Sequence, residues 1–483
     1  MSSTGVMVSR AHRIAIVART VRLVPALLVC ALVGTACGGG VHGTPGGSGV
    51  RDPYFPKAGN GGYDVTHYGL RLDYDPDAHH LTGTATLTAR ATEALSAFNL
   101  DLLGLAVGKV TVGGETARWN RAGQELTVRP GEDLDRHETF RVTVHYSGAP
   151  ETVTDPDGSQ EGWLRTTDGA LALGEPTGST AWFPGNHHPS DKASYDLTVT
   201  VPRGLRAVSN GELLSERTAR GRTTFVWRTA EPMASYLATL AIGDFGISRS
   251  TARDGLPVYT AVDPAEKEGS RAVLARIPEV LRWAERRFGP YPFSSTGAIV
   301  DRAADVGYAL ETQSRPVFPG APDMTLLVHE LAHQWYGDSV SPESWRDMWL
   351  NEGFATYVEW LWQEDHGGPS AQATFDAVYS GDHFDTEEAG EAIWEFPPAE
   401  PPSAARISDP PVYWRGAMVL HKIRQVVGDE AFGDILRGWA AAHRHGNADT
   451  ADFTAYVEEQ APGKDFDGIW EDWLYGEGKP ERA

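Results

Sequence analysis

The chain has 483 residues, more than one ordinary domain needs, so two or three domains with substantial cores are expected. Its 41% apolar and 22% charged residues are typical of a folded protein. The formal net charge is −23, and without the four arginines of residues 1–37 it becomes −23 − 4 = −27. So acidic a body argues against nucleic acid and anionic lipid as partners, although a well-solvated surface is the simplest reason for the charge.

Residues 1–37 have the pattern of an export signal. An apolar run at residues 23–34, too short to span a bilayer, follows four arginines: Arg10, Arg13, Arg19 and Arg22. Cys37 then stands where a bacterial lipoprotein signal places its acylated cysteine, with Gly34 where that pattern prefers an aliphatic residue. We expect an exported protein, held at the outer face of the cell membrane by lipid on Cys37, or secreted if Cys37 belongs to a discarded peptide.

The positions of the cysteines, and the glycines that follow the signal, indicate further properties of the mature protein. The chain has two cysteines, Cys30 and Cys37, and both lie in the signal segment, so the mature protein is expected to contain no internal disulfide. Residues 38–52 are rich in glycine and predict a flexible tether.

From residue 53 to residue 250 the pattern predicts an antiparallel β domain. Apolar residues alternate with polar ones in several segments that are separated by turn-forming stretches. Three such segments place these residues on one face: Tyr68, Leu70, Leu72 and Tyr74; Phe140, Val142, Val144 and Tyr146; Tyr195, Leu197, Val199 and Val201.

Beyond a boundary near residue 250 the periodicity becomes helical. Residues 272–289 place five apolar side chains on one helical stripe, with Pro278 as an interruption: Leu274, Ile277, Leu281, Ala284 and Phe288. Residues 251–483 are therefore expected to form a mixed, mainly α domain.

The segment from Leu326 to Val340, LLVHELAHQWYGDSV, contains the most informative motif. It reads as a helix with Gly337 as its terminator, so His329 and His333, four residues apart, face the same side and can hold one metal ion. Glu330 lies beside them, where it can take a proton from water. A helical histidine pair with a purely structural role is the alternative.

A glutamate downstream favours the catalytic interpretation. Glu352 lies near the start of a second predicted helix, WLNEGFATYVEWLWQEDHG, and 18 residues separate it from His333. Two histidines and one carboxylate leave a fourth position for water, which is typical of a catalytic zinc site. By itself, Glu352 would be an acid favoured by the helix dipole.

The motifs together resemble those of the M1 metallopeptidases, the gluzincin aminopeptidases. HELAHQWYGDSV and WLNEGFATYVE are similar to the family's zinc motifs, HPSDKASYDLTVTVP to a segment of its β domain, and VYWRGAMVLHKIR to the segment that carries its catalytic tyrosine. The resemblance runs from about Asp64 to the end of the sequence. It implies a saddle-like β domain followed by a thermolysin-like catalytic domain, without the helical C-terminal domain of many family members.

The resemblance also implies roles for individual residues. His329, His333 and Glu352 would bind one Zn²⁺ per chain, and Glu330 would be the general base. Tyr413 stands where the family keeps the tyrosine that stabilises the oxyanion, although alone it would be read as a packing residue. Arg415 stands where the family often has lysine, and we assign it no role.

Two further glutamates are candidates for binding the substrate's amino group. YALETQ resembles the family's GAMEN segment and places Glu311 on the glutamate that binds the α-amine. The match is partial, because Tyr308, Leu310 and Thr312 replace glycine, methionine and asparagine. Glu175 is the candidate from the β domain. The alternatives are a solvated strand carboxylate for Glu311 and a loop acid without a role for Glu175.

The predicted function is a zinc-dependent aminopeptidase that acts on peptides. One alternative is an open-cleft zinc endopeptidase or another zinc hydrolase, since the family also includes an epoxide hydrolase. The other is a non-catalytic surface-binding lipoprotein, against which the joint presence of Glu330 and Tyr413 argues.

Overall fold

The computed structural model describes residues 43–252, 255–302 and 304–482. The predicted signal segment, Cys37 with its predicted lipid, and residues 38–42 of the predicted tether lie outside the described residues. Within the described part, no helix combines the length and the apolar character that crossing a membrane requires.

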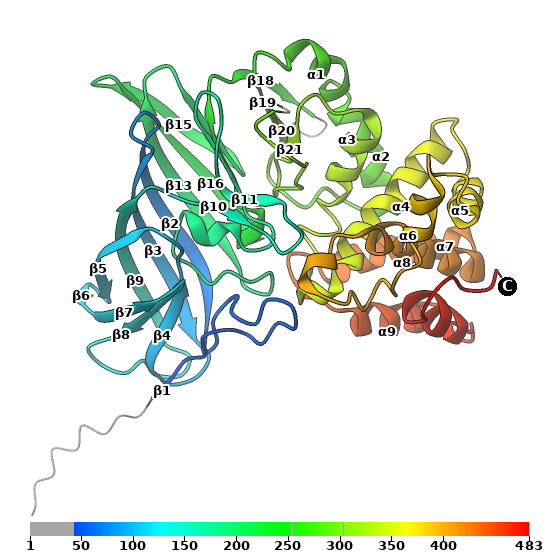
Figure 1. Ribbon diagram of the computed structural model, residues 1–483, viewed down its shortest axis with the longest axis horizontal. Helices are drawn as coiled ribbons and strands as arrows, with labels where there is room; N and C mark the ends of the chain where they lie inside the picture. The colour runs from blue at the N-terminus through cyan, green and yellow to red at the C-terminus, as the bar shows by residue number, and fades with distance from the viewer. Residues whose placement is uncertain (1–42, 253–254, 303, 483) are drawn as a thin grey trace, which may run out of the picture. The chain divides into compact units, whose positions relative to one another are not determined.

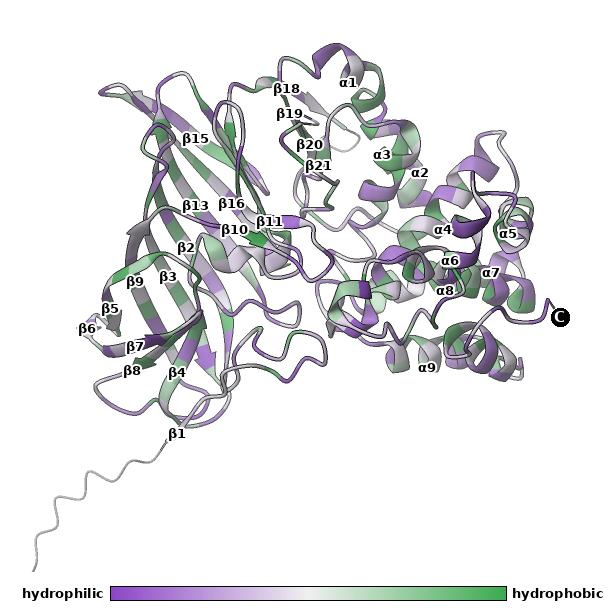
Figure 2. Cartoon of the chain, in the orientation of Figure 1, coloured by the Kyte–Doolittle hydropathy of each residue, from purple (hydrophilic) through white to green (hydrophobic). Residues whose placement is uncertain are grey.

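The first part of the chain is built on a large, strongly twisted sheet (Figure 1). Its strands in spatial order are β15 (Glu212–Ala219), β16 (Arg222–Ala234), β13 (Lys192–Pro202), β2 (Tyr63–Asp75), β3 (His80–Ala91), β9 (Thr139–Gly148), β5 (Ala106–Val112) and β6 (Glu115–Thr116). Neighbours are antiparallel except β13 and β2, which run parallel. Along these strands hydrophobic and hydrophilic residues alternate (Figure 2).

Two smaller sheets complete the β part. One has the order β1 (Thr44–Pro45), β4 (Leu95–Asp101), β8 (Glu125–Arg129), β7 (Arg118–Ala122). The other has the order β10 (Thr152–Thr154), β11 (Gln160–Arg165), β12 (Ala170–Leu173), β17 (Leu240–Gly243), β14 (Arg206–Ser209). All twelve side chains predicted on the inner faces of the strands are buried, which confirms the period-two interpretation.

The glycine-rich segment differs from the predicted tether in the part that the structure describes. Its strand β1 pairs with β4, and Asp52, 4% exposed, accepts hydrogen bonds from the ring of His188 and the backbone N–H of Trp345. A Cβ on Gly43 would lie 2.5 Å from the backbone of Leu95. The glycines here allow close backbone approach, a use that composition alone does not distinguish from flexibility.

The second part of the chain opens with a mixed sheet of β18 (Gly246–Thr251), β19 (Pro257–Val262), β20 (Thr296–Asp301) and β21 (Val317–Pro319). Because β18 pairs with β19, β18 already belongs to the second part. The boundary between the two parts therefore lies before β18, slightly earlier than the predicted residue 250. A short pair, β22 (Ser341–Pro342) and β23 (Asn447–Ala448), follows.

Helices make up most of the remainder. They are α1 (Lys267–Leu274), α2 (Ile277–Phe288), α3 (Met324–Ala332), α4 (Trp349–Asp365), α5 (Ala371–Ser380), α6 (Glu387–Ala392), α7 (Gly416–Val427), α8 (Asp429–Ala442) and α9 (Thr450–Gln460). The predicted helix around Pro278 is divided in two, because proline sits in the first turn of α2, where its missing N–H costs nothing. The five residues of its predicted stripe are all buried.

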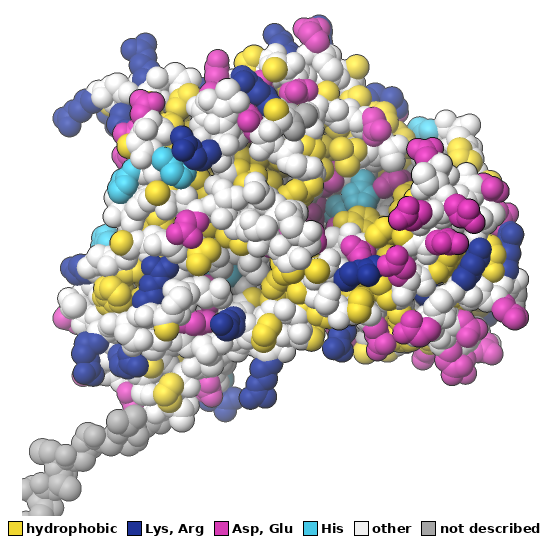
Figure 3. Space-filling model, viewed as in Figure 1, with side chains coloured by type: hydrophobic (Ala, Val, Ile, Leu, Met, Phe, Trp, Pro, Cys, Tyr) yellow, Lys and Arg dark blue, Asp and Glu magenta, His cyan; other side chains and the backbone are white. Residues whose placement is uncertain are grey.

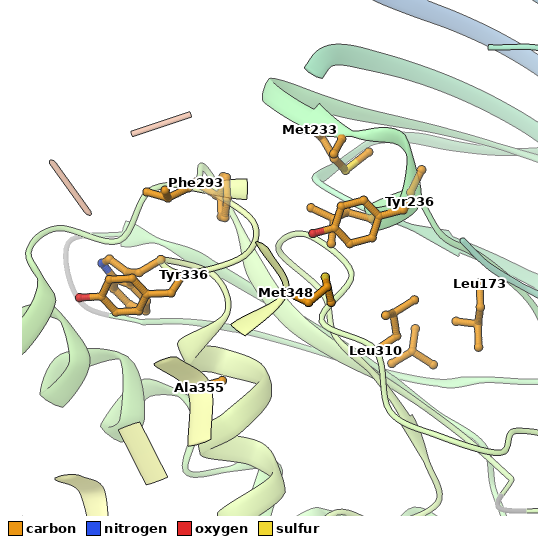
Figure 4. Packing of buried hydrophobic residues seen from close by; sticks show 14 of the residues in the cluster. Leu173, Met233, Tyr236, Phe293, Leu310, Tyr336, Met348 and Ala355 are labelled. Atoms are coloured by element: carbon orange, nitrogen blue, oxygen red, sulfur yellow. The ribbon is translucent and has the colours of Figure 1, made fainter. Parts of the chain in front are cut away.

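One hydrophobic core joins the two parts. Figure 4 shows Met233 and Tyr236 of the β part near Met348 and Leu310 of the second part. Partly buried polar contacts cross the same boundary: the Lys192 ammonium donates to the carbonyls of Asp338, Ser339 and Gly446 at 2.8, 3.0 and 3.1 Å. The two parts therefore pack as one compact unit, with β13 held against the turn that follows α3.

Candidate active site

Helix α3 presents the first two candidate metal ligands. Its N-cap is Asp323, whose carboxylate accepts from the N–H of Leu326 at 2.9 Å. The helix ends at Ala332, before the predicted terminator Gly337, but His333 keeps helical angles of φ −55° and ψ −25°. His329 and His333 therefore share one face, and their ring centroids are 4.7 Å apart.

Glu352 comes from the neighbouring helix α4, near its start as predicted. Its Oε2 lies 3.1 Å from Nε2 of His329 and 3.4 Å from Nε2 of His333. All three side chains are buried. The close approach of α4 requires glycine at residue 337, with φ +131°, because a Cβ there would lie 2.0 Å from Oδ1 of Asn351.

The other nitrogen of each histidine is held by the protein. Nδ1 of His329 lies 2.6 Å from Oε1 of Glu359, and Nδ1 of His333 lies 3.1 Å from the carbonyl oxygen of Tyr336. Each Nδ1 thus carries a proton and donates it, so Nε2, on the side of Glu352, is the nitrogen of each ring that is left to bind a metal. Fixing the tautomer in this way is typical of histidines that bind a metal.

The electrostatics of these three residues favour a cation among them. Burial alone would lower the pKa of His333, yet Glu352 and then Glu311 raise it to about 9. Burial alone would raise the pKa of Glu352, yet His333 and His329 hold it at about 2. The donor set is that of a zinc ion with an open fourth position, and the residues present therefore fit zinc.

Glu330 and Tyr413 flank the candidate metal ligands. An oxygen of Glu330 lies within 4.8 Å of the ligand atoms of Glu311 and His333, and burial raises the pKa of Glu330 to about 8. Tyr413 sits in one turn of π-helix, Pro411–Arg415, a feature often found at functional sites. Its ring lies parallel to that of His329, with 6.1 Å between centroids.

Glu311 and Glu175 meet on the other side of Glu352. One oxygen from each of the three lies within 4.8 Å of the others. Asn351 donates to Oε1 of Glu311 at 2.9 Å, and Gln334 donates to its backbone carbonyl at 3.1 Å. Oε1 of Glu175 is buried and without a hydrogen-bond partner. Burial, then Glu311, raises the pKa of Glu175 well above its usual range, so this pair of carboxylates favours a bound cation.

These side chains line one cleft of about 940 Å³. Figure 3 shows it as a hollow with histidine (cyan) at its floor and acidic side chains (magenta) around it. Its walls come from the turn of residues 155–160, the segment of residues 304–311, the start of α3 and residues 404–408. The structure thus brings all seven candidate residues of the active site together, while Arg415 binds backbone carbonyls near the C-terminus.

Two residues that position this site were not among the predicted ones. Glu359, which holds His329, lies seven residues after Glu352 and so on the same face of α4. That spacing is a signal the sequence contains. Asn351, which orients Glu311, directly precedes Glu352, but its role depends on tertiary contact and no local pattern indicates it.

Two family models match this chain. The peptidase family M1 domain matches residues 321–473, and the peptidase M1 N-terminal domain matches residues 64–237. The chain is 25% identical to glutamyl aminopeptidase of Sus scrofa over 84% of this chain and 46% of that protein. It is 22% identical to leucyl aminopeptidase of Saccharolobus solfataricus over 86% of this chain and 54% of that protein. The chain thus spans about half the length of these curated relatives.

Solved structures resemble the chain over most of its length. The M1 zinc metallopeptidase from Deinococcus radiodurans is 30% identical, with a TM-score of 0.81, covering 90% of this chain and 98% of that one. A mutant of it bound to a Tyr-Ser-Ala substrate gives the same identity and TM-score and is covered over its full length. A two-domain M1 zinc metallopeptidase bound to L-arginine gives a TM-score of 0.82 at 30% identity, covering 90% of this chain and 99% of that one.

Proposed function

Because the chain belongs to the M1 family of zinc metallopeptidases, we propose that it is an aminopeptidase that hydrolyses the first peptide bond of peptides with a free N-terminus. The observation that carries the proposal is the meeting of two kinds of group in one cleft. The candidate zinc ligands His329, His333 and Glu352 lie beside Glu330. Two further carboxylates, those of Glu311 and Glu175, lie next to Glu352.

Zinc is the cofactor of this family, with one ion expected per chain. His329, His333 and Glu352 would hold it, and when bound it supplies a Lewis acid that polarises a carbonyl and acidifies water. Glu359 and the carbonyl of Tyr336 keep the two histidines in the tautomer that this requires.

The other residues divide the chemistry among them. Glu330 takes a proton from the attacking water and gives it to the leaving amine, as a general base and then a general acid. The hydroxyl of Tyr413 donates a hydrogen bond to the carbonyl oxygen as negative charge develops there. Burial and the surrounding carboxylates hold the pKa of Tyr413 well above its usual range, so the hydroxyl keeps its proton.

Glu311 and Glu175 would bind the substrate's ammonium group and so set which peptide bond reaches the reacting groups. Asn351 and Gln334 fix Glu311 by its side chain and by its backbone. Although Tyr308 and Thr312 differ from the residues of the family's segment, Glu311 lies beside Glu352, which supports this role.

The test compares peptides that differ only at the N-terminus. A free-amine peptide and its N-acetylated form are incubated with zinc-loaded protein, with and without a chelator. Acetylation should lower kcat/KM about a hundredfold, since removing one partner of a desolvated charge pair costs about 2–5 kcal/mol. Cleavage of both forms at equal rates would favour the endopeptidase alternative, and no cleavage of either would favour a binding protein.

Export and membrane attachment are a separate proposal, supported only by residues 1–37. The four arginines, the short apolar run and Cys37 support export with a lipid anchor on Cys37. Mass spectrometry of the protein from its native cell should find an acylated Cys37 at the mature N-terminus, and Cys37→Ser should release activity from the membrane fraction. A mature chain that still begins at Met1 would contradict export through this signal.

A further inference from the structure

The cleft contains more acidic side chains than the reaction uses. Besides the residues assigned above, four acids line it: Asp155, Asp157, Asp305 and Asp323. Among the described residues no lysine or arginine lines it. Each of the four accepts from a protein donor: Asp155 and Asp157 from Ser159, Asp305 from Thr167, and Asp323 from Leu326. Asp155 differs from the others in burial, because it is only 8% exposed and its second oxygen, Oδ1, is buried without a partner.

Asp155 belongs to a buried group of oxygens without donors. Oε1 of Glu175 and the hydroxyl of Tyr308 are also buried, also without partners, and line the same cleft. Behind them Glu161, fully buried, accepts from the backbone N–H and the hydroxyl of Thr177, both at 3.0 Å. Buried acceptors left unpaired are costly, and a ligand with several N–H donors would satisfy them.

The acids are ordered along the cleft. Glu175 interacts electrostatically with Glu311 and Glu352 and also with Glu161 and Asp155. Glu311 and Glu175 meet beside Glu352, where the α-ammonium is proposed to bind. Glu161 accepts from Thr177, two residues after Glu175, so Glu161 lies near Glu175 but outside the group around the histidines, and Asp155 interacts with Glu161. Burial, then Glu161, raises the pKa of Asp155 to about 10, which shows how strongly this place disfavours an uncompensated second negative charge.

We propose that this end of the cleft receives a cationic side chain, so that the enzyme prefers peptides whose first residue is arginine or lysine, with Asp155 as the specificity-determining residue. The proposal rests on the proposed aminopeptidase function and names its substrate class. Arginine has five donors on a planar group and lysine has three, and both carry their charge at the end of a long side chain.

The test uses substrates in which only the side-chain charge changes. Aminoacyl-coumarins of arginine and citrulline have nearly the same shape, as do those of lysine and norleucine, and each reports the first residue alone. The zinc-loaded full chain should cleave the arginine substrate at least about tenfold faster in kcat/KM than the citrulline one, and lysine should likewise exceed norleucine. Equal rates within each pair would overturn the proposal while leaving the aminopeptidase function standing. If none of the four is cleaved, the proposed function itself fails.

A variant of Asp155 tests whether this residue causes the preference for a cationic side chain. Asp155→Asn keeps the shape but cannot become negatively charged when a cationic side chain binds, so the arginine-to-citrulline ratio should fall to about threefold or less. Asp157→Asn is the matched control, because Asp157 lies in the same turn but is exposed to solvent, and this variant should keep the wild-type ratio. An unchanged ratio in Asp155→Asn, or an equal fall in Asp157→Asn, would overturn the assignment. Because the wild-type comparison needs no variant, misfolding of Asp155→Asn does not remove the test.

Discussion

Asn351 donates a hydrogen bond from Nδ2 to Oε1 of Glu311, with 2.9 Å between the atoms, and Asn351 immediately precedes Glu352 in α4. One turn of helix thus provides both a candidate metal ligand and the donor that orients the candidate amine-binding carboxylate. Under the proposed function, two adjacent residues would therefore set the distance between the zinc ion and the substrate's N-terminus.

Replacing this donor should affect substrate binding more than metal binding. In Asn351→Ala, Glu311 loses a side-chain donor, and a hydrogen bond to a charged group contributes about 1.5–3 kcal/mol. We expect kcat/KM for free-amine peptides to fall at least about tenfold, chiefly through KM, while the zinc content stays near one per chain. Steady-state kinetics and elemental analysis measure these quantities. Loss of zinc in this variant would show that Asn351 acts on Glu352 instead.

Glu359 should control metal affinity without contacting the ion. Chelation should abolish activity, and added zinc should restore it. In Glu359→Ala, His329 loses the acceptor that fixes its ring, so zinc affinity should fall about 10–100-fold. Competition with a chromophoric chelator measures the change, and exposed Glu388→Ala is the control. Wild-type affinity in Glu359→Ala would mean that the contact is not needed to orient His329.

Glu330 and Tyr413 should be separable from the metal. Glu330→Gln keeps the size of the side chain but removes the base, so kcat should fall by about two orders of magnitude or more. Tyr413→Phe should also lower mainly kcat, because its hydrogen bond strengthens in the transition state. Both variants should keep their zinc. A wild-type turnover number in either variant would exclude the role given to that residue.

Lys192 should make the stability depend on pH. Burial lowers its pKa from 10.5 to about 7 in the folded protein, with Asp338 opposing the change. Between these two values the unfolded chain binds more protons, so the free energy of unfolding should rise with pH, by at most about 1.4 kcal/mol per unit. Urea unfolding at pH 7 and pH 9 should give a smaller rise in Lys192→Met than in wild type. Exposed Lys109→Met is the control, and equal slopes in all three proteins would contradict the prediction.

Local periodicity was enough to predict the strands of the β part and the mainly helical character of the second part. Tyr68 and Val199 alternate with polar neighbours because one face of each strand is buried, and that pattern is visible in any single strand. Their pairing was not predictable: β2 and β13 are parallel neighbours although about 120 residues lie between them, and no local signal states a partner across such a separation.

In the candidate site, too, some residues were predictable from local sequence and others were not. His329, His333 and Glu352 stand in motifs whose spacing carries the chemistry, so the sequence indicates them directly. Asp155 gives no such signal, because an acid in a turn is ordinarily exposed and only the folded structure shows that it is buried with one carboxylate oxygen unpaired. Asn351 and Glu161 likewise matter through contacts that the fold creates.

The contacts of Asp52 determine at which residue a recombinant form of this protein can begin. Its carboxylate accepts hydrogen bonds from the backbone N–H groups of Tyr54, Phe55 and Trp345 and from the ring of His188. The donor–acceptor distances are 2.8, 2.8, 3.0 and 3.2 Å. A recombinant chain begun at residue 64, where the family model begins, would leave the donors of His188 and Trp345 buried without an acceptor, just ahead of the helix that carries Glu352. Cloning should therefore retain the glycine-rich stretch from residue 43 onward as part of the enzyme.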